Sequence, residues 1–333
     1  MPRRSLSAKF AGNPPWGDSF QSDPSVEAAR RADGPLDATH VRAIFREVIS
    51  ASRSLEQRVR IAYLGPEATY AHLAALAQFG AAADYRPSAT IAEVFHDVEN
   101  GRADLGVVPV ENSTEGGVGQ TLDLLVESPL AICAEISIPV RHCLLARRGT
   151  TVASLRRVVA HPQALPQCRQ WLSGHLPGVA LIETTSNARA AERAAAETGT
   201  GAIAARAAAD RYGLDVLAEG IQDDPGNTTR FLVLAAADSP APSGDDKTSL
   251  VVSVRDEVGI LAKLLRPFAQ HGIDLIKIES RPLRERPWEY YFFLDLRGHR
   301  RERRVERALT AVARRALRAK VLGSYPAAPD RPE

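Results

Sequence analysis

Between about residues 59 and 236 the chain alternates short β-branched runs with helix-length amphipathic patterns. The runs typical of strands include RIAYLG, AADYRP, DLGVVPV, AICAEISIPV, HCLLA, RRVVAH, VALIETT, GAIAA and TTRFLVLA. Because strands connected through helices usually run side by side in the same direction, this alternation predicts an α/β fold with parallel sheets and helices on both faces. Sheets of this kind bind ligands beyond the carboxyl ends of their strands.

A linker rich in Pro, Ser, Gly and Asp, with the sequence ADSPAPSGDD at residues 237–246, ends this region. Beyond it, the pattern over residues 247–326 is strand, helix, strand, strand, helix, strand, and the second helix is strongly basic. This βαββαβ order is the ferredoxin-like motif. The sequence therefore predicts a second, smaller domain, followed by a short tail at residues 327–333.

The N-terminal region has a different composition. Residues 1–35 are rich in Pro, Gly, Ser, Ala, Arg and Asp and have no sustained apolar period, which predicts a mostly disordered segment. In residues 36–58, by contrast, apolar side chains recur at spacings of three and four. That spacing predicts one amphipathic helix.

Length and charge narrow the possible partners. A chain of 333 residues has room for about two domains and a large core. Lys and Arg number 42 against 40 Asp and Glu, and the net charge of +2 is too balanced for a protein dedicated to nucleic acids or to anionic membranes. No apolar run approaches the roughly 20 residues that span a bilayer. These features favour a small-molecule partner, with no nucleic acid and no membrane.

The cysteines favour a reducing compartment. Cys133, Cys143 and Cys168 have no metal-binding spacing and are odd in number, which is typical of reduced thiols in the cytoplasm. The first 17 residues are basic and lack acids, but no apolar segment follows them, so no export signal is predicted. A transit peptide remains an alternative. No metal site is predicted.

Three segments place hydroxyls and amides where a predicted strand stops or starts: residues 112–114, 184–187 and 227–229. Such side chains cap helix N-termini, where free backbone N–H groups and the helix dipole favour anions. If these segments converge on one cleft, they form a cradle for a small polycarboxylate. The alternative is that each segment is only a cap or a turn.

Five motifs in this region occur in the order and approximate spacing of prephenate dehydratases. They are GPEATY (65–70), VPVENSTEGGV (108–118), HPQALPQC (161–168), TSNARAA (185–191) and DDPGNTTRF (223–231). The smaller domain resembles the ACT regulatory domain, with ESRP at 279–282 and a glycine at the start of the EVGILAKLL helix. The resemblance covers about residues 59–326 and assigns 59–236 to the dehydratase domain and 247–326 to the ACT domain.

This resemblance implies a two-lobed dehydratase domain, similar to type II periplasmic binding proteins, with the substrate held between the lobes. Prephenate carries two carboxylates and a ring hydroxyl, and loss of water and carbon dioxide converts it to phenylpyruvate on the route to L-phenylalanine. Because aromatisation drives the reaction, the protein needs only to hold a dianion and to stabilise a departing hydroxide. The resemblance therefore implies no cofactor.

The family motifs also imply roles for particular residues. Thr229, in the TRF motif, is the expected catalytic hydrogen-bond donor to the leaving hydroxyl, and Glu111 or a water relay would supply the proton. Gly116 and Gly117 would let the backbone approach a bound acid closely. The other expected substrate-binding residues are Asn112, Ser113, Thr114, His161, Gln163, Gln167, Thr185, Ser186, Asn187, Thr228 and Arg230.

Structural roles remain open for several of these residues. Arg230 would instead pair with a helix or with Asp223, and His161 would cap a turn. Gln163 and Gln167 would reach the ligand or face water. The chain also departs from the family pattern: Ala68 stands where glycine is usual, and Ala71 and Ala160 stand where serine is common. The two serine replacements remove possible hydrogen-bond donors.

The ACT resemblance implies regulation by L-phenylalanine at the junction of two subunits, and so a homodimer or homotetramer. The expected effector-binding residues are Gly259, Ile260 and Leu261 of one subunit, with Glu279, Ser280 and Arg281 of the other. Ile260 replaces a common alanine and would change the shape of this pocket. A helix N-terminus beside a flexible glycine suits the α-carboxylate of phenylalanine, which favours binding there. We expect this binding to lower activity. The alternative is a domain that serves only dimerisation.

The helix at residues 36–58 resembles the last helix of the chorismate mutase domain that often precedes this dehydratase. The residues before it are interrupted by glycines and prolines, so we expect no mutase activity and a helix that packs on the dehydratase or on its partner. Three alternatives remain open. The chain would be a bifunctional chorismate mutase/prephenate dehydratase, an arogenate dehydratase, or a non-catalytic receptor or sensor of the same fold.

Overall fold

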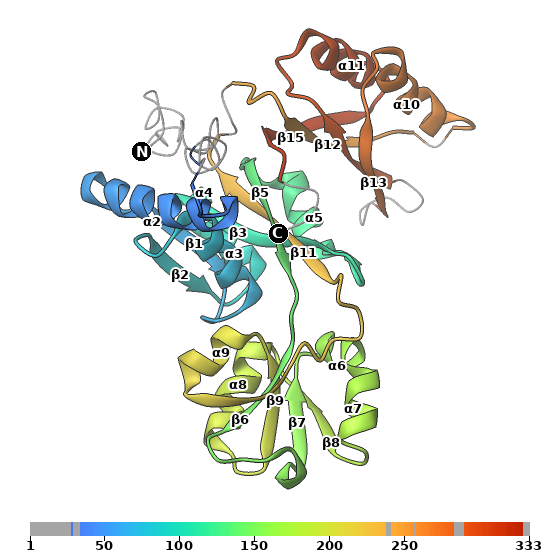
Figure 1. Cartoon of the computed structure of the whole chain (residues 1–333). Coiled ribbons are helices and arrows are strands. Elements are labelled where there is room, and N and C mark those ends of the chain that lie inside the picture. The colour runs from blue at the N-terminus through green and yellow to red at the C-terminus, as the bar shows by residue number, and fades with distance from the viewer. Residues whose placement is uncertain (1–27, 29–33, 238–240, 256, 283–289, 329–333) are drawn as a thin grey trace, which may run out of the picture.

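The computed structural model describes residues 28, 34–237, 241–255, 257–282 and 290–328. The prediction of disorder for residues 1–35 falls almost wholly outside these residues. The described chain forms two α/β lobes and a C-terminal domain that stands on the first lobe (Figure 1). The chain crosses from the first lobe to the second after β5 and returns before β11.

The first lobe contains a mixed sheet with the strand order β2-β1-β3-β11-β5, and β4 pairs with β3. Its strands are β1 (Arg60–Leu64), β2 (Asp84–Ser88), β3 (Leu105–Asn112), β4 (Gly116–Gly117), β5 (Ala131–Pro139) and β11 (Thr228–Ala235). Its helices are α3 (Tyr70–Phe79), α4 (Ile91–Glu99) and α5 (Gly119–Glu127). Side chains capping α3 and α4 come from Thr69 and Thr90, each of which accepts a backbone N–H of the first turn.

The expectation of purely parallel sheets is wrong. Strands β1, β2 and β3 are parallel, but β11 runs antiparallel to both β3 and β5. The reason is the double crossing between lobes: β5 leaves the first lobe and β11 returns to it, so the two strands run in opposite directions side by side. The pair therefore forms the connection from which the second lobe extends (Figure 1).

The second lobe has a five-stranded sheet with the order β10-β6-β9-β7-β8. Its strands are β6 (Cys143–Arg147), β7 (Arg157–Ala160), β8 (Ala180–Glu183), β9 (Thr200–Ala204) and β10 (Leu214–Glu219). Its helices are η2 (Val152–Ser154), α6 (Ala164–Gln167), α7 (Arg169–His175), α8 (Asn187–Ala196) and α9 (Arg206–Tyr212). One side of its core is built largely of alanines, which let α8 and α9 lie close to the sheet.

The C-terminal domain confirms the predicted βαββαβ order. Its elements are β12 (Asp246–Ser253), α10 (Ile260–Gln270), β13 (Leu275–Pro282), β14 (Tyr290–Arg297), α11 (Arg303–Ala313) and β15 (Arg318–Pro326). The sheet order is β13-β14-β12-β15, and α10 and α11 pack together on one face over a core that includes Leu264, Phe268 and Leu294.

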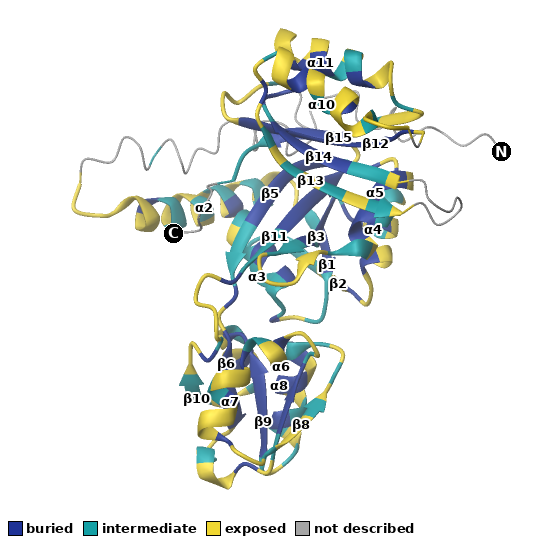
Figure 2. Cartoon of the chain, turned by 90° about the vertical axis from the view of Figure 1, so that its right-hand side faces the viewer, coloured by how far each residue is buried: buried dark blue, intermediate teal, exposed yellow. Residues whose placement is uncertain are grey.

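The other face of this sheet packs against the first lobe. Val251, Phe293 and Tyr325 belong to the same buried cluster as Leu125 and Ile132 of the first lobe. Figure 2 shows buried strands on both sides of this contact. At its closest point, a Cβ added to Gly323 would collide with the backbone carbonyl of Ile132, so a residue without a side chain lets β15 approach β5. The two units therefore share a core.

Helix α2 (Ala38–Glu56) confirms the single amphipathic helix expected near residues 36–58. Three hydrogen bonds join it to the first lobe: Arg46 Nη1 donates to the Ala77 carbonyl, Glu47 accepts from the Ala81 N–H, and Ser50 accepts from the Ala82 N–H. An apolar stripe on the opposite side is exposed and comprises Ile44, Phe45, Val48 and Leu55.

Candidate active site

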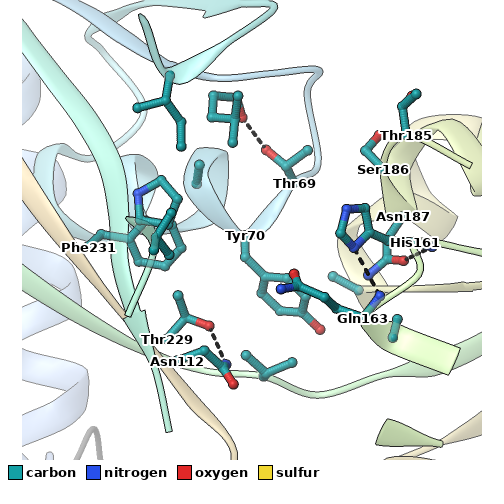
Figure 3. A pocket seen from close by; sticks show the side chains of 18 of the residues that line it. Thr69, Tyr70, Asn112, His161, Gln163, Thr185, Ser186, Asn187, Thr229 and Phe231 are labelled. Atoms are coloured by element: carbon teal, nitrogen blue, oxygen red, sulfur yellow. Dashed lines mark hydrogen bonds between the residues drawn. The ribbon is translucent and has the colours of Figure 1, made fainter. Parts of the chain in front are cut away.

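A cleft of about 940 Å³ lies between the two lobes. It is lined by loops at the carboxyl ends of β1, β2 and β3 in the first lobe, by β11, by the crossing segments, and by the starts of α6 and α8 in the second lobe. Figure 3 shows the labelled side chains facing this space from both sides. All three polar segments singled out in the sequence contribute to its wall: Asn112, Thr185, Ser186, Asn187 and Thr229 line it.

Strand β11 divides its residues between the cleft and the C-terminal domain. Thr229 and Phe231 line the cleft, whereas Arg230 points to the opposite face of the sheet because side chains alternate along a strand. Arg230 lies 2.7 Å from both Glu135 and Asp295, and donates to the Tyr325 hydroxyl at 3.0 Å. The structure therefore corrects the expectation that Arg230 binds substrate; it joins the first lobe to the C-terminal domain.

Glu111 is also turned away from the cleft. Its carboxylate lies 2.9 Å from Lys277 Nζ on β13 and 3.7 Å from Arg230, and the residue is not part of the cleft wall. The physical reason is again strand alternation, which places Asn112 and Glu111 on opposite faces of β3. The expectation that Glu111 supplies the proton is corrected accordingly.

Asn112 is the centre of a tight turn at the end of β3. Its Oδ1 accepts the N–H and the hydroxyl of Thr114, at 3.0 and 2.6 Å, and the N–H of Glu115 at 3.1 Å. Its Nδ2 donates to Thr229 Oγ1 at 2.9 Å and to Asn227 Oδ1 at 2.8 Å. Thr229 and the Asn112 turn, predicted to share one site, are thus in direct contact (Figure 3).

Three expected substrate ligands do not line the cleft. Ser113 Oγ accepts the N–H of Thr228, Thr114 donates to Asn112, and the Thr228 hydroxyl donates to the Gly226 carbonyl. These contacts shape the two turns that hold Asn112 and Thr229. The structure therefore corrects the expectation for Ser113, Thr114 and Thr228, because their polar groups are used locally.

The second lobe presents the N-terminus of α8 to the cleft. Ser186 caps this helix by accepting the N–H of Arg189 at 3.1 Å, and Asn187 Oδ1 accepts the N–H of His161 at 2.9 Å. Thr185, Gln163 and Arg189 complete this wall. Free N–H groups at the start of a helix attract anions, so this wall suits a carboxylate.

His161 is held in one tautomer. Its Nδ1 accepts the N–H of Gln163 at 3.3 Å, which leaves the proton on Nε2. Burial lowers the pKa of His161 below its ordinary value, although nearby Glu183 acts in the opposite direction. The neutral ring is therefore the dominant form at neutral pH, and it can donate one hydrogen bond from Nε2.

Gln167 connects the lobes. Its Oε1 lies 3.1 Å from Asn227 Nδ2 and 3.0 Å from His142 Nε2, and its Nε2 is 3.4 Å from Thr114 Oγ1 in the first lobe. Gln167 also forms part of the cleft wall, as does Gln163. Of the two glutamines, Gln167 has its polar atoms engaged with the crossing segments and the first lobe.

Several cleft residues were not predicted from the sequence. Tyr70 and His142 line the cleft beside the crossing, and the Tyr70 hydroxyl donates to the Arg141 carbonyl at 2.7 Å. Burial raises the pKa of Tyr70. Tyr70, Arg189 and Phe231 belong to motifs quoted from the sequence, so those motifs were the signal that could have found them. His142 had no local signal, because only the fold shows that the crossing passes through the site.

The loop between β1 and α3 explains one departure from the family pattern. Ala68 has φ of +63°, in the left-handed region that favours glycine. Its methyl group is buried in the alanine-rich core cluster of the second lobe. The alanine thus adopts a conformation for which glycine is usual, and it uses its side chain to link the lobes.

The expected effector residues lie on two sides of β13 and at the start of α10. Gly259 has φ of +77° and precedes α10, with Ile260 and Leu261 in its first turn. Glu279 and Arg281 face the first lobe: Glu279 contacts Gly117, and Arg281 lies 3.0 Å from Asp123. Ser280 is exposed on the opposite face. We expected Gly117 to let the backbone approach a bound acid; in the structure the acid beside Gly117 is the carboxylate of Glu279.

The described residues contain no cluster of three or more His, Cys, Asp or Glu side chains that could hold a metal ion. In the same part of the chain, no helix combines the length and the apolar character needed to cross a bilayer.

Comparison with known proteins assigns the chain to a family. The prephenate dehydratase family model matches residues 61–239, and the ACT domain model matches residues 248–314. The bifunctional chorismate mutase/prephenate dehydratase of Aquifex aeolicus is 50% identical over 285 residues, which are 86% of this chain and 78% of that protein. The prephenate dehydratase of Mycolicibacterium gilvum is 41% identical, over 80% of this chain and 90% of that protein.

A solved structure agrees with this result. The prephenate dehydratase of Arthrobacter aurescens, in complex with L-Phe, superposes with a TM-score of 0.76 at 36% identity, over 83% of this chain and 92% of that chain. The expected α/β fold with a type II periplasmic-binding-protein-like dehydratase domain and an ACT domain is confirmed. The chain therefore belongs to the prephenate dehydratase family, in the form that carries an ACT domain.

Proposed function

We propose that the interlobe cleft binds prephenate and that Thr229 donates a hydrogen bond to the ring hydroxyl as it departs. The chain is an enzyme of aromatic amino acid biosynthesis, a prephenate dehydratase that forms phenylpyruvate, water and carbon dioxide. The observation that carries the assignment of the site is the contact between Thr229 and Asn112, at 2.9 Å, on the wall of this cleft.

The cleft suits a doubly charged substrate. Helices α3 and α8 both begin at its wall, and their N–H groups favour carboxylates. Arg189 adds a positive charge at the same wall, while His161, neutral at pH 7, adds a donor. Phe231 and Tyr70 provide apolar surface for the ring. Neutral donors around a partly enclosed space stabilise the developing hydroxide without requiring a strong acid.

Glu111 does not supply the proton for the departing hydroxide, because its carboxylate is turned away from the cleft. We propose that Thr229 transmits a proton from a water molecule to the departing hydroxide, because a hydroxyl is both a donor and an acceptor. Thr185, Asn187 and Gln163 then serve as substrate ligands on the second lobe.

The decisive test of substrate is a comparison of prephenate with arogenate. We expect turnover of prephenate, followed by the absorbance of phenylpyruvate in alkali, with a higher kcat/KM than for arogenate. A higher kcat/KM for arogenate would reassign the enzyme to the aminated substrate. Absence of turnover with both would favour a receptor or sensor.

We further propose that L-phenylalanine binds at a junction of two ACT domains and lowers activity. The Arthrobacter aurescens relative was solved with L-Phe. In this chain β13 lies at the edge of the described sheet, and Ile276, Ile278 and Leu261 are exposed beside it. Such an apolar edge suits a second copy of the chain, which gives a homodimer or a homotetramer.

Activity measured with and without millimolar phenylalanine tests this regulation, and sedimentation at several protein concentrations tests the assembly. Equal activity in both conditions would contradict inhibition. A monomer at micromolar concentration would contradict the shared effector site.

We propose the following division of the chain: helix 36–58, dehydratase domain 59–236, linker 237–246, ACT domain 247–326 and tail 327–333. We also propose a cytoplasmic location, which the three buried cysteines without disulfides support. Since the Aquifex aeolicus relative is named as bifunctional, chorismate is a second substrate to assay. Formation of prephenate from chorismate would overturn our expectation that mutase activity is absent.

A further inference from the structure

The hydrogen bonds around Thr229 have a direction that the backbone determines. Two backbone N–H groups, those of Thr114 and Glu115, point at one atom of the Asn112 amide. Because a backbone N–H can only donate, this atom is the oxygen and the other is the NH₂ group. The turn at the end of β3 thus identifies which end of the Asn112 amide is the oxygen.

The consequence reaches Thr229. The Asn112 NH₂ group donates to Thr229 Oγ1 at 2.9 Å, so the hydroxyl oxygen is an acceptor on the protein side. The hydroxyl keeps its own proton for another partner. Since Thr229 lines the cleft, that proton is available to a bound substrate.

The same logic continues away from the cleft. Asn112 Nδ2 also donates to Asn227 Oδ1 at 2.8 Å, so the Asn227 NH₂ group faces Gln167 and donates to Oε1 at 3.1 Å. Gln167 Oε1 is also 3.0 Å from His142 Nε2, which therefore carries the ring proton. Asn227 is 1% exposed and His142 is 2% exposed, so water does not compete for these groups.

We propose that Asn227 and Gln167 are positioning residues that keep the Asn112 amide directed at Thr229, so that the Thr229 proton points into the cleft. This inference rests on the role proposed above for Thr229. The chain of contacts joins α6 of the second lobe, both crossing segments and the ends of β3 and β11. Gln167 of the second lobe thereby supports, through Asn227, the alignment of a donor that belongs to the first lobe.

Replacement of Asn227 by Asp tests the direction of the hydrogen bonds from Asn112 through Asn227 to Gln167. An Asp carboxylate still accepts from Asn112, but when ionised it has no proton for Gln167 Oε1 and repels that oxygen. When protonated, it donates as the amide does. At about pH 8 we expect a kcat at least about tenfold below wild type with KM within about threefold, because the interaction acts through Thr229 and not through substrate contacts.

At about pH 5.5 the ratio of variant to wild-type kcat should recover to within about threefold of one, because a buried carboxyl is readily protonated there. The titratable side chains near position 227 are His142, Glu115, Asp223 and Asp224, from the crossings and the Asn112 turn. These side chains are present in both the variant and the wild type. Their own titration therefore cancels in the ratio of the two kcat values. A ratio that does not change with pH overturns the proposal.

A matched control places the same charge nearby, at a residue that is not part of this series of hydrogen bonds. Gln170 is exposed at the start of α7, three residues after Gln167. Gln170→Glu should have a kcat ratio near one at both pH values. A recovery at low pH in this variant as well would show that charge alone, and not the hydrogen-bond direction, causes the effect, and would overturn the proposal.

A second variant keeps the test decisive if Asn227→Asp is poorly folded. In Asn112→Asp the carboxylate accepts the Thr229 proton and draws it away from the cleft, so kcat should fall about 100-fold while the melting temperature stays near wild type. Near-normal kcat in this variant overturns the proposal. Thr229→Ala separates the two levels: if it stays active, the assigned role of Thr229 fails, and if it is inactive while Asn227→Asp shows a constant ratio, only the positioning fails.

Discussion

At the scale of single residues, the alternation of side chains along β3 and β11 separates residues that face the cleft from residues that face the ACT domain. Thr229 faces the cleft and its neighbour Arg230 faces the ACT domain, although both belong to one short motif. Asn112 and Glu111 divide in the same way on β3. A motif of adjacent residues can therefore serve two different purposes, because consecutive side chains of a strand point to opposite faces.

Thr229→Ala removes the hydroxyl that we propose as the donor to the leaving group, and it should lower kcat about 100-fold or more, as does loss of a single preorganised donor in other enzymes. Thr229→Ser keeps a hydroxyl and should retain most of the activity. The kinetics of phenylpyruvate formation give both values. Equal activity of the Ala and Ser variants would contradict the assigned role.

Arg230→Met removes the cation beside Asp295, whose side chain is 11% exposed, and one of two cations beside Glu135, which is 1% exposed and keeps Lys247 at 2.7 Å. We expect a loss of about 3 to 5 kcal/mol in the free energy of unfolding, as for other broken buried ion pairs. Arg102 forms an exposed pair with Asp97 and provides the control, for which Arg102→Ala should cost less than about 1 kcal/mol. Urea unfolding of both variants measures the difference, and similar values would contradict a supporting role for Arg230.

At the scale of elements, helix α5 and strand β10 were not predicted from the sequence. The segment that follows the HPQ motif is divided at Cys168 into two helices, α6 and α7. Cys168 is completely buried, and burial raises the pKa of its thiol to about 12. The division places Gln167 at the end of α6, within reach of the crossing segments.

Strands β15 and β5 pack so closely that Gly323 cannot accept a side chain. Gly323→Ala should lower the free energy of unfolding by about 1 to 3 kcal/mol or more, because the obstacle is backbone and cannot move aside. Gly174, inside α7, has open space around its Cα. Gly174→Ala should therefore stabilise by about 0.5 to 1 kcal/mol. Thermal and urea unfolding test both signs, and a harmless Gly323→Ala would show that the interface can adjust.

At the scale of the whole molecule, the ACT domain packs tightly against the first lobe of the dehydratase domain. Besides the shared core, Lys320 Nζ donates to the carbonyls of Leu125, Val126 and Ser128 at the end of α5. Burial, followed by the charge of Arg318, lowers the pKa of Lys320. Helix α5 begins at the cleft, so one element touches both the interlobe cleft and the ACT domain.

The stability of the molecule should depend on pH through its buried histidines. Burial lowers the pKa values of His72, His142 and His161 below the ordinary value of about 6.5. Below that pH the unfolded chain binds more protons than the folded one, so stability falls as pH decreases. Urea unfolding from about pH 7.5 down to pH 5 should show this decline, and His142→Gln should reduce it. A stability that rises over this range would contradict the argument.

Much of this protein was predictable from its sequence alone. Hydrophobic periodicity and turn residues are local, so the alternating α/β pattern, the ferredoxin-like order and helix α2 were predicted near their observed bounds. The ordered motifs led to the family and to the cleft residues Asn112, His161, Asn187 and Thr229.

Only the tertiary structure decided which members of each motif face the interlobe cleft. The direction of a side chain depends on strand register and on what packs against each face, and these are set by residues distant in the sequence. Arg230 is directed by Glu135 and Asp295, and the Asn112 amide by its turn and by Asn227. His142 enters the site because the chain crosses there between lobes, which no short stretch of sequence encodes.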